Sequence, residues 1–292
     1  TGEVTEETTE PTVEITEPAL DLFAEDDDAI TSGICGAQGD NLTWTYQDGT
    51  LTISGEGDMA DYSANRTAPW QGYTEIKKIV LEPGVTSIGD FAFYFCYANS
   101  VEIAESVNKI GEFAFALSGL NEVKIPDGVI SIGDYAFGYC WQIAAVAMPD
   151  SVTTIGVGAF ACSSLTSVAI PKNVTKIPAL AFYECSSLIS VRIPADVTSI
   201  GEDAFSGCEK LKEVSYGGSR ADWGNIQIEM GNTGLLNAKL SCDTEGEPFT
   251  EIRPLDIRYL VSGGKVTLTA WAIPGEDQVS TRWSLAPEDG AY

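Results

Sequence analysis

Between Ile76 and Tyr216 the apolar residues recur with a fixed period. Six isoleucines are each followed five residues later by a phenylalanine, and successive pairs are 22 or 23 residues apart. The pairs are Ile88 and Phe93, Ile110 and Phe115, Ile132 and Phe137, Ile155 and Phe160, Ile177 and Phe182, and Ile200 and Phe205. A period of this size predicts a solenoid, in which each repeat buries its apolar side only by stacking on its neighbours.

Two other apolar positions keep the same step. A valine lies three residues before each isoleucine, and an alanine lies directly before each phenylalanine. We interpret both as core positions, with alanine small because the backbone passes close. The valines are Val85, Val107, Val129, Val152, Val174 and Val197, and the alanines are Ala92, Ala114, Ala136, Ala159, Ala181 and Ala204.

Each repeat also contains a short segment in which apolar and polar residues alternate. In residues 120–125, Val123 and Ile125 alternate with polar neighbours, which predicts a strand with one buried face. Proline ends four of these segments, where its missing N–H interrupts no ladder bond. Seven parallel strands are therefore expected, at residues 76–81, 98–103, 120–125, 143–148, 165–170, 188–193 and 211–216.

A glycine follows the isoleucine in five repeats, and Pro178 takes its place in the fifth repeat of the series. Because proline holds φ near −65°, this position needs no positive φ. Proline suits the first position of a helix, and the acid that follows in Gly89-Asp90 or Gly111-Glu112 suits a helix N-terminus. We therefore expect Ala-Phe-x-x-Cys to form a short helical turn.

The seven cysteines leave two interpretations open. Five of them are assigned to one repeat position, where buried thiols act as small apolar groups. They are Cys96, Cys140, Cys162, Cys185 and Cys208. The alternative is that the last four pair along the stack, because adjacent strands lie about 4.8 Å apart and disulfides tolerate Cα separations from about 4.4 Å. Cys35 and Cys242 lie at opposite ends and cannot pair.

The repeat reads Val-x-x-Ile-Gly-x-x-Ala-Phe-x-x-Cys-x-x-Leu-x-x-Val-x-Ile-Pro, most completely in residues 129–149 and 174–194. It resembles the BspA-like, treponemal-type subclass of leucine-rich repeats in bacterial surface proteins. The resemblance implies a right-handed leucine-rich-repeat solenoid of parallel β-strands, short helical turns and loops, with about six repeats plus caps. Residues 36–57 are similar to the family's N-terminal cap, and residues 216–238 to its C-terminal cap.

Composition shifts divide the chain. Residues 1–30 hold eleven acids and no Lys or Arg, which predicts a disordered linker. Residues 31–75 predict an N-terminal β cap with an Asp48-Gly49 hairpin, residues 76–216 the leucine-rich repeats, and residues 217–243 a C-terminal cap. Residues 249–292 resemble an incomplete all-β immunoglobulin-like domain, with Trp283 as its core tryptophan. Since such domains need about 100 residues, a truncated domain and a smaller β module both remain open.

Charge and composition exclude several functions. The net charge of −27 argues against nucleic acid or anionic membrane as a partner, since both require basic patches. The absence of histidine removes His-based catalysis and His-ligated zinc. Glu25–Asp28 lacks the ligand spacing of a calcium loop, and Asp58 and Asp61 are expected to be solvated loop residues. We expect no enzyme activity, no metal and no cofactor.

Two exposed faces are candidates for ligand binding. The outward positions of the strands form a shallow face, uncharged in its middle, with Glu122, Lys124 and Arg192 as candidate contacts. A second set of aromatic residues surrounds the cysteines, and exposed aromatic rings suit sugar faces or a protein partner. The alternative for this set is packing against neighbouring loops. Its members are Tyr94, Tyr97, Tyr139, Trp141 and Tyr183.

The resemblance implies an extracellular or cell-surface adhesion module that recognises a host or neighbouring-cell protein, a matrix component or a glycan. A non-binding spacer within a larger surface protein is the alternative. No run of residues is long and apolar enough for membrane insertion, and a monomer is expected. The sequence begins without methionine or a signal peptide, so we expect a mature or trimmed product.

Overall fold

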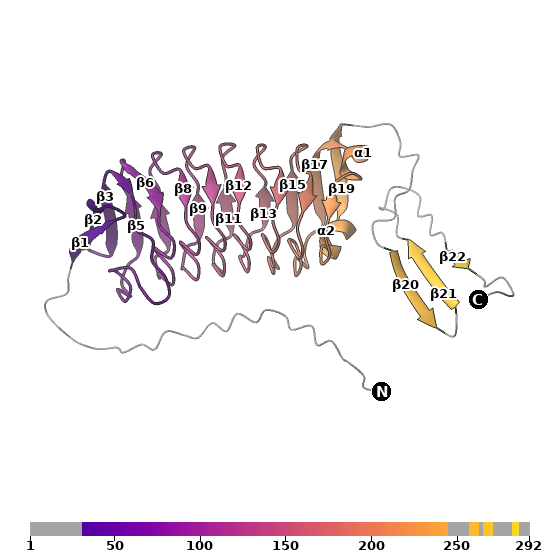
Figure 1. Ribbon diagram of the computed structural model, residues 1–292, viewed down its shortest axis with the longest axis horizontal. Coiled ribbons are helices and arrows are strands. Elements are labelled where there is room, and N and C mark those ends of the chain that lie inside the picture. Colours follow the sequence, from indigo (N-terminus) through magenta and orange to yellow (C-terminus); the bar gives the residue numbers. More distant parts are fainter. Residues whose placement is uncertain (1–30, 245–256, 263–264, 271–281, 286–292) are drawn as a thin grey trace. The chain divides into compact units, whose positions relative to one another are not determined.

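The computed structural model describes residues 31–244 and three short strands at 257–262, 265–270 and 282–285. The predicted linker of residues 1–30 lies outside the described residues. Residues 31–244 form a stack of rungs that runs from β1 to β19 (Figure 1). Each rung contributes to two sheets and one turn segment, and its apolar side chains meet inside.

The seven strands expected from the alternating segments follow one another along one side of the stack in three hydrogen-bonded sheets, and those that pair run parallel. We call these strands together the first sheet. Strictly equivalent residues pair across rungs, as Val123 does with Val146 and Val168 with Val191. The strand-to-strand register therefore places every repeat directly over the next. The strands are β5 (Lys78–Leu81), β7 (Ser100–Glu102), β9 (Glu122–Lys124), β11 (Ala145–Ala147), β13 (Ser167–Ala169), β15 (Ser190–Ile193) and β17 (Glu213–Ser219).

A second row of short parallel strands runs along the other side in two hydrogen-bonded sheets and contains the isoleucine positions. We call these strands together the second sheet. Sequence reasoning identified these isoleucines as core but did not assign them to strands, because most of the strands are only two residues long. They are β4 (Gly57–Asp58), β6 (Val85–Ile88), β8 (Lys109–Ile110), β10 (Ser131–Ile132), β12 (Thr154–Ile155), β14 (Lys176–Ile177), β16 (Ser199–Ile200) and β18 (Gln227–Ile228).

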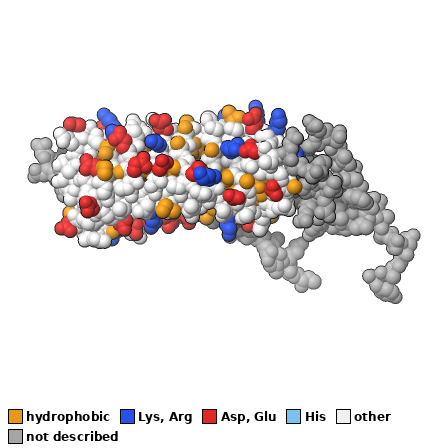
Figure 2. Space-filling view, turned by 90° about the horizontal axis from the view of Figure 1, so that it is seen from above, with side chains coloured by type: hydrophobic (Ala, Val, Ile, Leu, Met, Phe, Trp, Pro, Cys, Tyr) orange, Lys and Arg blue, Asp and Glu red, His pale blue; other side chains and the backbone are white. Residues whose placement is uncertain are grey.

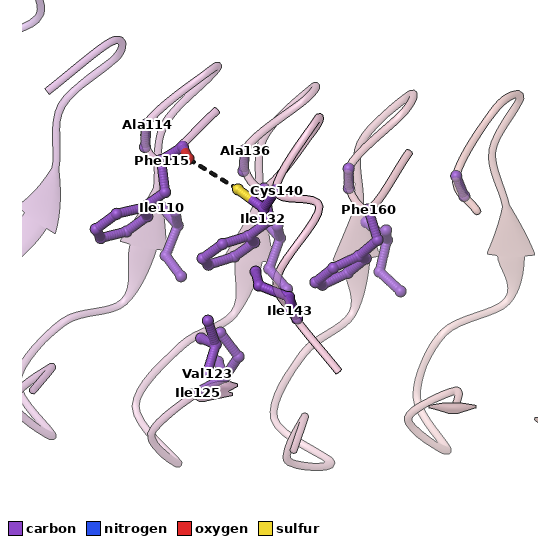
Figure 3. Packing of buried hydrophobic residues seen from close by; sticks show 14 of the residues in the cluster. Ile110, Ala114, Phe115, Val123, Ile125, Ile132, Ala136, Cys140, Ile143 and Phe160 are labelled. Atoms are coloured by element: carbon purple, nitrogen blue, oxygen red, sulfur yellow. Dashed lines mark hydrogen bonds between the residues drawn. The ribbon is translucent and has the colours of Figure 1, made fainter. Parts of the chain in front are cut away.

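The six phenylalanines form one continuous stack between the sheets, as the period predicts. Consecutive ring centroids lie 5.1 to 5.7 Å apart, with interplanar angles of 4° to 17°. All six rings are buried. Figure 3 shows Phe115 and Phe160 in this row beside Ile110 and Ile132. Trp70 of the N-terminal cap stacks on Phe93 at 5.4 Å and lengthens the row by one ring.

The segments after each isoleucine are not the helical turns that the sequence suggested. They form a third set of bonds between rungs, which we call the turn ladder: residues 90–95, 112–117, 134–139, 157–162, 179–184 and 202–207. In the first of them, the N–H groups of Phe91, Phe93 and Phe95 donate to carbonyls of the next rung at 2.7 to 2.8 Å. The N–H groups in between close local turns, as Ala92 does with Gly89.

Left-handed backbone makes this alternation of N–H directions possible. Two positions per rung have φ between 49° and 74°, and most are not glycine. A helix of consecutive right-handed residues would point all its N–H groups along its own axis. The left-handed positions are Phe91, Phe95, Phe113, Leu117, Tyr135, Tyr139, Gly158, Cys162, Leu180, Glu184, Asp203 and Gly207.

The glycine after each isoleucine does not adopt positive φ, as Pro178 implied. It is small because the preceding rung approaches closely: a Cβ at Gly111 would lie 2.7 Å from the Asp90 nitrogen. The acid that follows does not cap a helix. Asp90 Oδ1 accepts the Glu112 N–H at 2.8 Å, and Asp134 Oδ1 accepts the Val157 N–H at 2.8 Å. These carboxylates therefore satisfy backbone donors of the next rung.

The assignment of Cys162 to the common cysteine position is wrong. The position three residues after each phenylalanine is filled by Cys96, Ser118, Cys140, Ser163, Cys185 and Cys208. Cys162 lies one residue earlier, at a left-handed position, because the rung length changes there. The column residues bond along the stack: Cys140 Sγ donates to the Phe115 carbonyl at 3.0 Å and contacts Ser118 Oγ at 3.3 Å (Figure 3).

All seven cysteines are free thiols, so the disulfide alternative is not realised. Burial raises the pKa of Cys140 to about 11 and that of Cys96 to about 11. A thiol with such a pKa stays protonated at neutral pH and serves as a small hydrogen-bonding core group.

The N-terminal cap is built on β1 (Ser32–Gly36), β2 (Gly39–Gln47) and β3 (Thr50–Gly55), which pair in antiparallel order. The expected hairpin is present, with Asp48 at φ 50° and Gly49 at φ 77°. β3 then pairs in parallel with β5. Trp44 and Trp70 are buried core residues.

The N-terminal cap also supplies donors to the exposed acceptors of the first turn segment. The Tyr62 N–H donates to the Asp90 carbonyl at 2.8 Å, and Trp70 Nε1 donates to the Ala92 carbonyl at 2.8 Å. The side chain of Gln71 donates to Tyr94 O at 3.2 Å. Cap and ladder are thus joined by hydrogen bonds as well as by the ring stack.

The C-terminal cap contains α1 (Arg220–Trp223), α2 (Thr233–Asn237) and β19 (Lys239–Thr244), and β19 extends the first sheet beyond β17. Its buried Asn232 terminates the turn ladder. Asn232 Oδ1 accepts the N–H of Phe205 at 3.0 Å, and Nδ2 donates to the carbonyls of Gly201, Glu229 and Met230 at 2.9 to 3.2 Å.

Three further strands near the C-terminus form an antiparallel sheet in the order β20 (Ile257–Ser262), β21 (Lys265–Ala270) and β22 (Arg282–Leu285). The sequence predicts an all-β segment over residues 249–292. The immunoglobulin-like interpretation stays a prediction, since most of residues 249–292 lie outside the described residues.

We predict that Asn232→Ala lowers the free energy of unfolding by about 2 to 4 kcal/mol, because it leaves the buried Phe205 N–H without its acceptor. Urea titration followed by circular dichroism measures the change. Asn225→Ala, which removes the same side chain from an exposed place in the cap, is the control and should cost little. Equal stability of the two variants would contradict the capping role of Asn232.

Candidate functional site

The outward face of the first sheet is the first candidate binding surface. Glu122 and Lys124 are exposed on β9 and lie opposite Ala145 and Ala147 of β11. Arg192 is exposed on β15, three rungs further along. The structure therefore places the three candidate residues on one face but does not bring Arg192 together with the other two.

A shallow depression of about 470 Å³ lies on this face at its C-terminal end. Small hydroxyl and alanine residues form its floor, and one acidic and two basic side chains stand around it. β13, β15, β17 and β19 contribute its lining, which includes Ser167, Ala169, Ser190, Arg192, Glu213, Ser215, Lys239 and Ser241. Sequence reasoning missed Lys239 and Ser241 because β19 belongs to the cap and does not carry the repeat pattern.

Arg192 is positioned by its neighbours on this face. Nη1 donates to Ser215 Oγ at 3.1 Å, and Nη2 forms an ion pair with Asp243 Oδ2 at 2.6 Å. Both side chains of this pair are about half exposed, so water screens the attraction and the pair contributes little to stability. The guanidinium therefore lies at the surface between Ser215 and Asp243.

Other charges are scattered over the solenoid. Lys78 pairs with Glu102 at 2.5 Å, and Lys172 pairs with Asp150 at 2.7 Å, both on the surface. Figure 2 shows acidic and basic side chains spread along one side of the stack with small apolar patches between them. That view shows no large single-sign area that would define a charged docking site.

The aromatic residues around the cysteines divide into two groups. Phe91, Phe113 and Tyr135 form an outer stack, with centroids 4.8 and 5.0 Å apart and nearly parallel planes. Tyr139 continues it at 6.4 Å from Tyr135 with an interplanar angle of 10°. Tyr94 packs against the same stack at 5.4 Å from Phe91. The faces of these rings are covered by one another, which supports the packing interpretation for Tyr94 and Tyr139.

Partial burial accompanies this packing. Desolvation raises the pKa of Tyr94. Desolvation is also the largest cause of the raised pKa of Tyr139, and the neighbouring Cys162, Tyr135 and Tyr183 raise it further. Tyr183 is half-buried on a later rung. Sequence reasoning missed Phe91, Phe113 and Tyr135, because ring stacking between rungs is visible only once the left-handed positions are known.

Tyr97 and Trp141 differ from the rest of the aromatic set. They are 56% and 58% exposed, and each ring is turned by 66° or 67° from its aromatic neighbour, Phe95 or Tyr139. Their faces are thus not occupied by the outer stack. These two residues remain candidates for ligand contact.

The acidic residues of the N-terminal cap have structural partners. Asp58 Oδ1 accepts a hydrogen bond from Thr86 Oγ1 at 2.6 Å, and this bond and one from Ser87 lower the Asp58 pKa. Asp61 Oδ1 accepts the Asp90 N–H at 2.9 Å. In the described part of the chain, no three His, Cys, Asp or Glu side chains are grouped as metal ligands. Nor does any helix within those residues have the length and apolarity to cross a bilayer.

The chain is a leucine-rich-repeat solenoid. Its parallel rungs of 22 or 23 residues are stacked, and each rung places apolar residues at the same core positions. A family model described as BspA type leucine-rich repeat region, in six copies, matches residues 70–189 and 175–225. These matches span more than half of the chain. The chain belongs to the BspA-type leucine-rich repeat family.

Solved structures with a similar fold come from several bacteria. A leucine-rich repeat protein of T. pallidum is 22% identical with a TM-score of 0.47, covering 59% of this chain and 88% of that chain. One from Eubacterium ventriosum is 22% identical with a TM-score of 0.39, covering 73% and 79%. A leucine-rich cell surface protein of Faecalibacterium prausnitzii is 21% identical with a TM-score of 0.32, covering 65% and 97%. No curated protein matches the chain.

We predict that Glu112→Gln raises the melting temperature at neutral pH. Desolvation, then the neighbouring Asp134 and Asp90, raise the pKa of Glu112 in the folded state. A raised carboxyl pKa means that the folded state binds more protons than the unfolded chain, so stability falls as pH rises through the folded-state pKa. The gain from the uncharged glutamine should therefore be largest at pH 7, shrink as pH falls through the folded-state pKa, and be absent below the ordinary value of about 4.3.

Differential scanning calorimetry of both proteins across this pH range measures the effect. The control is Glu209→Gln, which makes the same change at an exposed residue of the last repeat. A melting temperature for Glu112→Gln that is lower than that of the parent chain at pH 7 would contradict the assigned repulsion.

Proposed function

We propose that this chain is a non-enzymatic binding module of a bacterial surface protein and that it recognises a protein partner through the exposed face of β13, β15, β17 and β19. The observation that carries the proposal is the depression of about 470 Å³ on that face. The location outside the cell or at its surface is inferred from membership in the BspA-type family.

The shape of the depression favours an extended or flat partner. It is open along the strands and shallow, whereas sites for small substrates are usually concave and enclose most of the ligand. Its floor of serine and alanine side chains lets another backbone approach closely, and the serine hydroxyls can both donate and accept hydrogen bonds. A protein segment lying across the strands would meet a new hydroxyl at each rung, about 4.8 Å further on.

The charges around the depression favour a partner with an acidic group. Arg192 offers a planar guanidinium that can bind a carboxylate through two parallel hydrogen bonds. Lys239 lies opposite Glu213 in the register of β17 and β19, so one basic and one acidic side chain are neighbours across these strands. This arrangement selects a partner that places its acidic group near Arg192, and rejects one that carries acids along its whole length.

Rigidity also supports a binding role. β15 and β17 are fixed by parallel pairing on both sides, and β13 and β19 each pair with one of them, so little ordering of these strands is needed when a partner binds. Two of these side chains are held further: Arg192 donates to Ser215 Oγ, and Ser241 Oγ donates to the Val214 carbonyl. A pre-formed surface of this kind suits recognition by complementarity of shape.

The experiment that tests this proposal probes an array of purified extracellular matrix proteins with the full chain. We expect retention by at least one of these proteins, and we expect Arg192→Glu with Lys239→Glu to reduce the affinity at least tenfold, because two favourable charges become repulsive. Surface plasmon resonance against the retained protein measures the change. Raised salt should weaken binding of the parent chain.

The matched control reverses two lysines on the opposite sheet, Lys109→Glu and Lys176→Glu, which are also exposed. This variant carries the same change in charge and should bind normally. Equal loss in both variants would point to overall charge and contradict a site on the strand face. Failure of every matrix protein to bind would favour the structural spacer.

A further inference from the structure

A second surface, chemically distinct from the depression, lies where each rung turns from the turn ladder into the first sheet. Six large apolar side chains are exposed among the described residues, and only two of them are aromatic. These two, Tyr97 and Trp141, directly follow Cys96 and Cys140, which occupy one repeat position. They therefore lie in equivalent places on two rungs of the stack.

The rung between them carries a glycine at the same place. Gly119 follows Ser118, and its N–H donates to the Cys96 carbonyl at 3.2 Å, which fixes it beside the first rung. A Cβ on Gly119 would lie 2.8 Å from the Tyr97 carbonyl oxygen, so the backbone leaves no space for a side chain here. Tyr97 and Trp141 are thus separated by two rung spacings, about 10 Å, with a side-chain-free step between them.

Uncharged hydrogen-bonding groups surround the two rings. Asn99 and Asn121 lie on neighbouring rungs, joined by the Asn121 N–H to the Asn99 carbonyl at 3.2 Å, and both are exposed. Gln142 is exposed beside Trp141. The next rung contributes Ser164, whose Oγ donates to the Trp141 carbonyl at 2.5 Å. The amides offer donors and acceptors together, which matches hydroxyl groups.

This corner of the solenoid lacks charge over four rungs. Residues 91–101, 113–121, 135–149 and 155–171 contain no Asp, Glu, Lys or Arg, although charged residues make up 20% of the chain. The charged residues next to it are Glu122, which directly follows Asn121, and Lys77 on the preceding rung, whose carbonyl accepts the Asn99 N–H at 3.0 Å. The chain has a net charge of −27, but this surface carries no charge of its own. It therefore offers an ionic ligand no local electrostatic attraction.

We propose that Tyr97, Trp141 and the amides of Asn99, Asn121 and Gln142 form a binding site for a neutral glycan. The two rings present apolar faces on which sugar rings stack, and the amides bind sugar hydroxyls. The glycan chain runs along the solenoid axis and passes over Gly119, where no side chain obstructs it. This site differs in position and chemistry from the strand-face depression, and neither depends on the other.

The chemistry of the corner distinguishes a glycan from other ligands. An anionic glycan or an acidic peptide would need basic residues along its length, and residues 91–101, 113–121, 135–149 and 155–171 contain none. Protein interfaces rely on arginine as well as aromatic anchors at their energetic centres. Exposed aromatic rings with amides and hydroxyls, without charge, fit a ligand that is itself uncharged and rich in hydroxyl groups.

The test probes the full chain with an array of neutral gluco-, manno- and galacto-oligosaccharides, followed by calorimetric titration of those retained. Trp141→Ala and Tyr97→Ala should each weaken binding about tenfold, from the loss of one stacked ring, and the double variant should bind none. Trp141→Tyr keeps an aromatic face and should retain most of the affinity. Binding should stay constant from low to high salt, since no ion pair forms.

Two controls make the result decisive. Met230→Ala removes an exposed apolar side chain in the C-terminal cap, at 77% exposure, and should leave glycan binding unchanged. Arg192→Glu with Lys239→Glu should also bind glycan normally, which separates this site from the strand face. Absence of binding to every neutral oligosaccharide overturns the proposal. So does full binding by a folded Tyr97→Ala, Trp141→Ala double variant, or binding that falls with salt.

Discussion

Backbone hydrogen bonding from one rung to the next is the constraint on which this structure depends. Each rung contributes to two parallel sheets and to the turn ladder, so most of its backbone donors and acceptors are satisfied by its neighbours. Buried backbone groups without partners are costly, which forces successive rungs into strict register. The phenylalanine stack and the isoleucine core are consequences of that register, because equal positions must then lie over each other.

The same constraint explains the caps. A solenoid that ended abruptly would leave a row of carbonyls at one end and a row of N–H groups at the other. At the N-terminal end Tyr62, Trp70 and Gln71 supply three donors to the turn ladder. At the C-terminal end the Asn232 side chain replaces the missing carbonyl for Phe205. In the turn ladder each cap thus substitutes single groups for a whole rung, whereas in the first sheet β3 and β19 pair with the end strands.

What the sequence could predict follows from how often each feature is repeated. The isoleucine, phenylalanine and strand positions recur in every repeat, so the parallel stack and its exposed strand face were accessible from periodicity alone. The turn ladder was not, because its left-handed positions hold Phe91, Tyr135 or Glu184, residue types that give no sign of positive φ. Cys162 was misplaced because the segment from Phe160 to Leu165 is one residue shorter than the matching segments around Cys140, Cys185 and Cys208. Lys239 and Asn232 belong to a cap that occurs once, and a single occurrence has no period to reveal it.

The turn ladder also limits where this fold can present aromatic rings to a ligand. A bulky residue in left-handed backbone costs roughly 1 to 2 kcal/mol, and a stacked ring pair returns about 0.5 to 1.5 kcal/mol beyond the area it buries. Stacking among Phe91, Phe113 and Tyr135 therefore offsets the cost of their left-handed backbone, and the stacked faces of these rings are covered by one another. A ring can offer its face to solvent only where the chain leaves the ladder. Tyr97 and Trp141 lie at that point, immediately after the last buried thiol of their rungs, so the geometry that stabilises the stack also restricts aromatic recognition to the corner.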